Sequence, residues 1–243
     1  MKIKKKIFSL LLVLCLAFSS VISVSADTNY DQSTSNLNYS RLSVESYKDW
    51  IQSQVNTKHS NSYEAQNFLK EFNNLTKYEQ ELFVSYLNDS DLILEILNLI
   101  SSNKAYTALE SGNIIVSNNQ TFQNEETTIG PRATMQYRLG EGTSTVTIFG
   151  IEIFQYSGEI RYSHNGSSIK EISHANIWIS KNWIPFTSFS WDDASTYGVG
   201  TTVAHHIEYC TWSFVHPNLG LTYGTHQIEI TGSTSNKTTF TVS

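Results

Sequence analysis

The chain has 243 residues, of which 40% are hydrophobic, 12% aromatic and 16% charged. This composition provides enough apolar material for one or two domains with buried cores, and it excludes a disordered chain. Acidic residues (22) outnumber basic ones (16), which gives a net charge of −6. Since no basic run follows the N-terminus, the sequence disfavours partners such as nucleic acid and anionic lipid headgroups.

The first 26 residues have the pattern of an export signal that is removed from the mature protein. Four lysines within the first six residues precede an apolar stretch, Ile7–Phe18, and Val24-Ser25-Ala26 stands before a cleavage site at Asp27. A retained membrane anchor is the alternative, but the apolar stretch is short and serines follow it from Ser19. We therefore expect residues 1–26 to be a signal peptide and the protein to be secreted and extracellular.

The two cysteines bear on this expectation in different ways. Cys15 follows Leu14, where lipoprotein signals have a small residue, so the sequence predicts no stable membrane anchor after cleavage. Cleavage removes four lysines from 16 basic residues, leaving 12 against 22 acidic residues and a net charge of −10. Cys210 would be left without a disulfide partner, and we expect it to be buried in the core.

A flexible leader is predicted over 27–41 and a helical region over 42–101. Apolar residues recur there at helical spacing in four stretches, with a break near His59-Ser60-Asn61. Ser43 and Asp89 are placed as N-caps, and Thr76 with Glu79 forms a capping box by sequence. The last of the four stretches is apolar on nearly every side, so that helix must be packed inside the structure; its apolar residues are Leu92, Ile93, Leu94, Ile96, Leu97, Leu99 and Ile100.

Residues 102–131 are predicted to be a linker, because Ser117–Thr121 and Gln123–Thr128 are polar and aperiodic; Asn113–Val116 leaves room for a short strand. From residue 132 the hydrophobic period changes to two. We therefore predict an antiparallel β-sandwich of Ig-like type over 132–243, with seven or eight short strands. A change of phase near Gly150 predicts a bulge, and Asn165-Gly166 predicts a hairpin turn. The fold class is α+β by segments.

The stretch Thr201–Phe214 is a long run of strand-favouring residues. Val203, His205, Ile207 and Tyr209 alternate with Ala204, His206, Glu208 and Cys210. Bulky side chains on both faces predict a central strand that is covered on both sides.

The order of these elements resembles secreted proteins of Gram-positive bacteria that join a short helical region to one Ig-like β-domain. The resemblance is carried by the lysine-rich signal, the helix LTKYEQELFVSYLND and the hairpin VTIFGIEIFQYSGEIRYSHNGSSI. It covers most of the mature chain and implies secretion and a two-part architecture. It brings no catalytic motif and no activity with it.

An aromatic segment is the candidate ligand-binding site. Five large aromatic residues fall within fourteen positions, beside Asn182 and Asp192; they are Trp178, Trp183, Phe186, Phe189 and Trp191. Exposed indole rings can stack on sugar rings while amides and carboxylates bind the hydroxyls, so we predict a ligand surface at Trp178, Trp183, Trp191 and Asp192. Core packing of the same residues is the alternative.

The sequence patterns that would indicate metal binding or catalysis are weaker than the aromatic segment. His206, Glu208 and Cys210 share one strand face, and another strand could add His164, His174, His216 or His226, but no Cys-x-x-Cys or His-Glu-x-x-His spacing is present. The alternative is a set of hydrogen-bonded imidazoles. Asp192-Asp193 is an adjacent carboxylate pair that reads as a turn, and the sequence has no Gly-x-Ser-x-Gly elbow. We predict no metal, no cofactor and no catalytic residue.

These observations favour a secreted, non-enzymatic interaction protein that binds an extracellular protein or glycan through its β-sandwich. A secreted hydrolase and a pore-forming toxin are the alternatives. Convergent carboxylates or a Cys–His contact in a cleft would favour the hydrolase, and a long amphipathic hairpin detached from the core would favour the toxin.

Overall fold

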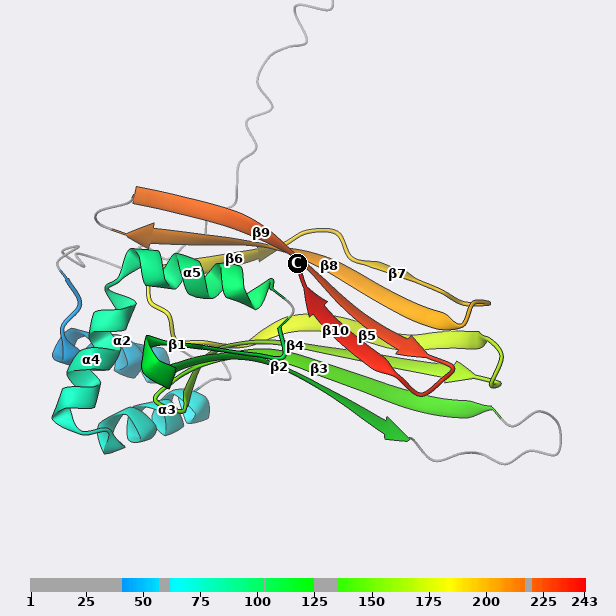
Figure 1. The fold of residues 1–243 in the computed structure, drawn as a ribbon, viewed down its shortest axis with the longest axis horizontal. Coiled ribbons are helices and arrows are strands. Elements are labelled where there is room, and N and C mark those ends of the chain that lie inside the picture. The colour runs from blue at the N-terminus through cyan, green and yellow to red at the C-terminus, as the bar shows by residue number, and fades with distance from the viewer. Residues whose placement is uncertain (1–40, 57–61, 103, 125–134, 217–219) are drawn as a thin grey trace, which may run out of the picture. The chain divides into compact units, whose positions relative to one another are not determined.

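The computed structural model describes residues 41–56, 62–102, 104–124, 135–216 and 220–243 (Figure 1). The predicted signal peptide lies outside these residues, as do the leader apart from Arg41, the centre of the break near residue 60 and the end of the predicted linker. All described residues belong to one compact unit, Tyr39–Ser243. Four helices come first in this unit and strands follow, as the sequence predicts.

The helices are α2 (Val44–Asn56), α3 (Ser62–Asn74), α4 (Lys77–Leu87) and α5 (Ser90–Ile100). The predicted caps are confirmed. Thr76 Oγ1 accepts from the Glu79 amide at 3.3 Å while the Thr76 amide donates to Glu79 Oε2 at 2.8 Å. Asp89 Oδ1 accepts from the amides of Asp91 and Leu92 at the start of α5. Each cap satisfies backbone donors that the first helical turn leaves free.

The strands form two antiparallel sheets, which confirms the predicted sandwich. Sheet A has the order β1-β2-β3-β4-β5, with β1 (Tyr106–Leu109), β2 (Ile114–Asn124), β3 (Gln136–Ile148), β4 (Ile151–His164) and β5 (Ile169–Asn182). Sheet B has the order β10-β9-β8-β6, and β7 also pairs with β8. Its strands are β6 (Thr187–Trp191), β7 (Ser195–Tyr197), β8 (Val203–His216), β9 (Gly220–Ser233) and β10 (Thr238–Val242). The Ig-like type is not confirmed, because that order divides its early strands between the sheets, whereas β1 to β5 form one meander.

The predicted linker differs most from the structure. Its residues form β1 and β2, and β2 pairs with β3 along its whole length, from Ile114 opposite Ile148 to Asn124 opposite Arg138. The inward positions Asn118 and Gln120 are polar, so the hydrophobic alternation is lost. Gln120 Nε2 instead donates to the Phe240 carbonyl at 3.1 Å, and Asn118 Nδ2 donates to the Lys104 carbonyl at 2.8 Å. Hydrogen bonds take the place of apolar burial on this strand.

One local expectation is confirmed and one is corrected. The register of β3 and β4 shifts at Val146/Thr147, as the predicted bulge near Gly150 requires, and Phe149 and Gly150, both with positive φ, form the turn between the two strands. A two-residue turn of this kind matches the twist of a hairpin. The strand β8 is central, between β9 and β6/β7, but only its inner face is fully covered; Tyr209 on the outer face is exposed.

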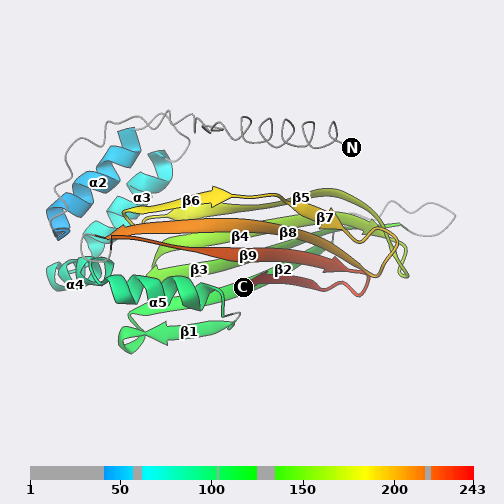
Figure 2. The ribbon, with the colours of Figure 1, turned by 90° about the horizontal axis from the view of Figure 1, so that it is seen from above.

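The two ends of the sandwich pack differently. At one end, which we call the helix end, α5 lies at the edge of the sandwich, with β9 of sheet B on one side and β1 and β2 of sheet A on the other (Figures 1 and 2). Its residues Ile93, Ile96, Leu97 and Ile100 are buried in a core that is continuous with both sheets. The other helices join this core, since the Tyr47 hydroxyl donates to the Trp183 carbonyl at 2.8 Å.

At the opposite end, which we call the glycine end, the sheets approach closely. A Cβ on Gly142 would lie 2.1 Å from Phe240 Cβ, and a Cβ on Gly232 would lie 2.1 Å from Tyr162 Cε1. Side chains of one sheet therefore rest directly on the backbone of the other. The same end holds Gly140, Arg138 and His164 on the inner face of sheet A.

Candidate functional site

The structure does not bring the predicted aromatic residues together. Trp178 lies on β5 in sheet A and Trp191 at the end of β6 in sheet B; their exposed fractions are 36% and 37%. Trp191 makes an edge contact with Tyr156, and Asp192 follows it on the surface, where its amide donates to the Tyr209 carbonyl. Trp183 is only 5% exposed and stacks on Phe68 with ring centres 5.0 Å apart. The segment therefore supplies separate surfaces and a core contact, not one platform.

Trp178 belongs to a row of side chains that crosses the outer face of sheet A. Its neighbour Ile177 is buried, so Trp178 points away from the core. The register places Asn119 opposite Thr143, Thr143 opposite Ser157, and Ser157 opposite Trp178. Three strand spacings make this row roughly 14 Å long. We call it the Trp178 row.

A groove of about 240 Å³ runs along the Trp178 row. Its polar groups are an amide, hydroxyls and a carboxylate, contributed by Asn119, Thr121, Glu141, Thr143 and Ser157. Neighbouring side chains hold several of these groups in place. Ser157 Oγ is 2.9 Å from Ser180 Oγ, and Glu141 Oε2 accepts from Gln123 Nε2 at 3.0 Å. The groove therefore combines an exposed indole with fixed hydrogen-bonding groups.

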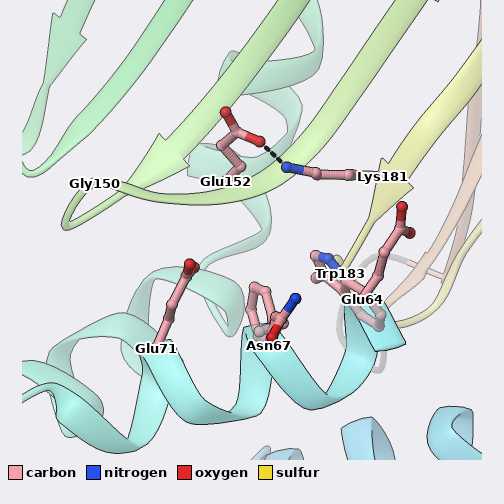
Figure 3. Close-up of a pocket in the computed structure, with 8 residues that line it drawn as sticks. Glu64, Asn67, Glu71, Gly150, Glu152, Lys181 and Trp183 are labelled. Carbon is pink, nitrogen blue, oxygen red and sulfur yellow. Dashed lines mark hydrogen bonds and ion pairs between the residues drawn. The ribbon is translucent and has the colours of Figure 1, made fainter. Parts of the chain in front are cut away.

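A second hollow, of about 450 Å³, lies between α3 and sheet A (Figure 3). Glu64, Asn67 and Glu71 line it from α3, and Glu152 lines it from the start of β4, where it forms an ion pair with Lys181. Phe68 and the edge of Trp183 also contribute. Figure 3 shows Glu71 and Glu152 on opposite walls. Three carboxylates against one ammonium make this helix–sheet pocket acidic.

The candidate metal ligands on β8 have other partners. His206 is buried, with Nδ1 2.7 Å from Thr196 Oγ1 and Nε2 2.8 Å from Glu208 Oε1. Both ring nitrogens of His206 are thus within hydrogen-bond distance of another side chain. Glu208 is one of these partners, in line with the alternative of hydrogen-bonded imidazoles. Within the described ranges, no group of three or more His, Cys, Asp or Glu side chains is arranged to hold a metal ion.

Cys210 is buried, as predicted, in a polar network at the helix end. It hydrogen-bonds the Tyr156 hydroxyl, which lies 3.1 Å from His226 Nδ1, and the His226 imidazole donates to the Leu97 carbonyl of α5. Burial raises the pKa of the Cys210 thiol to about 11 and lowers the pKa of His226 to about 4. Both groups are therefore neutral near pH 7, and the thiol is a poor nucleophile.

The fold and these surfaces define the class of protein. A helical region is joined to an antiparallel β-sandwich, and the polar outer face of sheet A carries the exposed Trp178. Comparisons with protein-family models, with curated proteins and with solved structures find no match. In the part of the chain that the structure describes, no helix is both long enough and apolar enough to cross a membrane.

Sequence reasoning missed the partners of Trp178. Asn119 and Thr121 stand in the segment assigned to the linker, and Thr143 and Ser157 read as ordinary outward strand positions. A signal was present in the alternation of hydroxyl side chains on two strands beside a tryptophan. It becomes informative only with the register, which places all four residues of the row side by side.

Proposed function

We propose that this protein is a secreted, non-enzymatic binding protein whose β-sandwich recognises an extracellular glycan through the Trp178 row. The observation that carries the proposal is the exposed indole of Trp178 in line with Asn119, Thr143 and Ser157. The apolar face of a sugar ring can stack on an indole, while amide and hydroxyl groups bind the sugar hydroxyls. The predicted signal peptide supports an extracellular setting for such a ligand.

The charge of the groove narrows the class of glycan. Glu141 lies in the groove, and Glu159 is opposite it on β4. Carboxylates repel acidic sugars and accept hydrogen bonds from hydroxyl or amino groups. The expected ligand is therefore a neutral or amino-sugar glycan, and the net negative charge of the mature chain acts in the same direction. No cofactor takes part in this binding.

The test is glycan binding by the mature chain, screened on an array and then measured by calorimetry. Trp178→Ala should weaken binding to any glycan found by tenfold or more. Trp191→Ala is the matched control, because it removes a tryptophan of equal exposure from sheet B and should change the affinity less than twofold. Equal losses of glycan affinity in both variants would refute the Trp178 row as the binding site. If the protein binds no glycan, the proposal of a glycan ligand is wrong, and a protein is the expected partner.

The hydrolase alternative has one observation in its favour, the helix–sheet pocket with carboxylates on opposite walls. Glycoside hydrolysis uses two carboxyl groups placed across the scissile bond. If the protein is a hydrolase, incubation with the glycans that it binds should release sugar, and Glu71→Gln or Glu152→Gln should abolish that release. Binding without release in the unaltered protein supports the non-enzymatic function.

The feature that would favour a pore-forming toxin is not found among the described strands. The long hairpin β8–β9 is packed on the core through Cys210, Trp212 and Phe214, all buried on the inner face of β8. A hairpin held in this way would have to leave a large apolar contact before it could enter a membrane.

A further inference from the structure

Arg138, at the glycine end, carries a buried positive charge without a counter-charge. Its residue is 6% exposed, and its hydrogen bonds go to neutral groups. Nε donates to Asn236 Oδ1 at 3.1 Å, Nη1 donates to the Tyr137 carbonyl at 3.0 Å, and Nη2 donates to Gln136 Oε1. Among the described residues, no carboxylate pairs with this guanidinium. The guanidinium lies over the Phe122 ring, with Cζ 5.6 Å from the ring centre, but a ring face is not a full counter-charge, so this end of the sandwich favours an anion.

His164 provides an independent sign of a ligand at the same place. It is 1% exposed, and its Nδ1 accepts from the Gly166 amide at 3.1 Å, which puts the proton of the neutral ring on Nε2. The Asn236 side chain is a hydrogen-bonding neighbour of this imidazole, but no described residue reaches Nε2 within ordinary hydrogen-bond geometry. The hydroxyl of Thr238, also buried, has no hydrogen-bond partner among the described residues either. Buried polar atoms of this kind are commonly satisfied by a water or an ion.

The sheet registers bring these groups together. Arg138 is opposite Tyr162, and Gln136 is opposite His164, so Arg138 and His164 are diagonal neighbours on the inner face of sheet A. Thr238, from sheet B, packs against Gly140, the next inward position after Arg138 on β3. Asn236, in the turn between β9 and β10, is exposed and marks the side that is open to solvent.

We propose that the glycine end binds an oxyanion, namely a carboxylate, phosphate or sulfate group, through Arg138, His164 and Thr238. Arginine has five N–H donors, of which three are used, so two remain for the ligand. The planar guanidinium suits two oxygens of one such group, and His164 Nε2–H and the Thr238 hydroxyl add single hydrogen bonds. This site is on the inner face of sheet A, whereas the Trp178 row is on the outer face, so the two proposals are independent.

The test is a titration of the mature chain with sodium phosphate, sodium sulfate or sodium acetate at constant ionic strength, followed by the NMR signals of Arg138 Nε–H and the His164 ring. At least one of these anions should give a saturable shift of both signals. Arg138→Lys, which keeps the charge but loses the fork, and His164→Gln should each weaken that binding by tenfold or more. The preferred anion tells whether the natural ligand carries a carboxylate or a tetrahedral group.

Lys237→Gln is the matched control, because it removes an exposed positive charge from the same end of the sandwich. It should leave the affinity within twofold of the original. Two results would overturn the proposal: no saturable shift with any of the three anions, or an equal loss in Lys237→Gln, which would indicate general attraction to surface charge. The conservative Arg138→Lys variant, checked for an intact fold by its amide spectrum, keeps the test valid if His164→Gln does not fold.

Discussion

The two ends of the sandwich fill the space between the sheets in opposite ways. At the helix end, α5 lies between the edges of the two sheets, and the polar groups of Cys210, Tyr156 and His226 are joined in a network that reaches the Leu97 carbonyl. At the glycine end, the sheets meet closely, Arg138 is buried without a carboxylate partner among the described residues, and His164 Nε2 has no hydrogen-bond partner among them. The difference teaches that a buried helix and a hydrogen-bonded network fill one end of the sandwich, whereas direct contact between the sheets fills the other and leaves a charged side chain buried there.

The largest expected effect comes from breaking the helix end at Leu97. Leu97→Asp places a carboxylate at a fully buried position. We expect a loss of about 4 kcal/mol or more in the free energy of unfolding, enough to unfold the protein. Urea unfolding followed by circular dichroism measures it. Asn98→Asp, on the exposed side of the same helix, is the control, and equal losses would show that α5 is not buried.

A second prediction uses the pH dependence of the same end. Burial lowers the pKa of His226 to about 4 from 6.5, so between these values the unfolded chain binds the proton and the folded chain does not. Stability is therefore complete above pH 6.5 and falls as the pH decreases toward 4, by about 3 kcal/mol from this residue. His164, whose pKa is also lowered, acts in the same direction.

Unfolding free energies measured from pH 7.5 to 4 isolate the contribution of His226. His226→Gln should reduce the change of unfolding free energy with pH over this range. If the unfolding free energy of His226→Gln changes with pH as steeply as that of the unaltered protein, the His226 imidazole is protonated in the folded state. This result would contradict the network of Cys210, Tyr156 and His226.

The close contact of the sheets gives a third prediction. Gly142→Ala puts a methyl group 2.1 Å from Phe240 Cβ, an atom fixed to the backbone of β10. The sheets would have to move apart, at a cost of about 2 kcal/mol. A thermal melt is sufficient to measure it, with Ser190→Ala on the exposed face of β6 as control. A melting temperature equal to that of the control would mean that the two sheets are not in contact at Gly142.

The smallest effect is expected at His206. Because its two nitrogens bond Thr196 and Glu208, His206→Ala should cost about 1 to 2 kcal/mol through lost hydrogen bonds. A chelator should not change the melting temperature of the unaltered protein, since metal binding energy would otherwise appear as folding energy. If the purified protein contains stoichiometric zinc and His206→Ala removes it, then His206 is a metal ligand, and the structural role is wrong.

The sequence predicted the elements whose signals are local. The capping box at Thr76, the apolar helix α5 and the buried Cys210 all depend on side-chain chemistry within a few residues, and the structure confirms them. The β2 strand was missed because Asn118 and Gln120 replace apolar inward residues. Their hydrogen bonds run to Lys104 and Phe240, and the Phe240 contact is distant in the sequence.

The candidate sites were harder to predict for the same reason. Proximity in the sequence grouped Trp178, Trp183 and Trp191, but strand alternation and the change from sheet A to sheet B send their side chains to different places. Conversely, Arg138, His164 and Thr238 are far apart in the chain and meet only through pairing and sheet contact. Such clusters depend on register, which local periodicity does not determine.

Native-state hydrogen exchange of residues 27–243 tests the contrast between the two ends most directly. The account predicts that amides of α5 and of the central strands β8 and β9 exchange only through global unfolding, all with one free energy. Amides beside Arg138 and His164 should exchange through smaller openings and become slower when an oxyanion is bound. Exchange of α5 amides at a clearly lower free energy than that of β8 and β9 amides would contradict the account. The helices would then form a separate domain, with its boundary within residues 102–131.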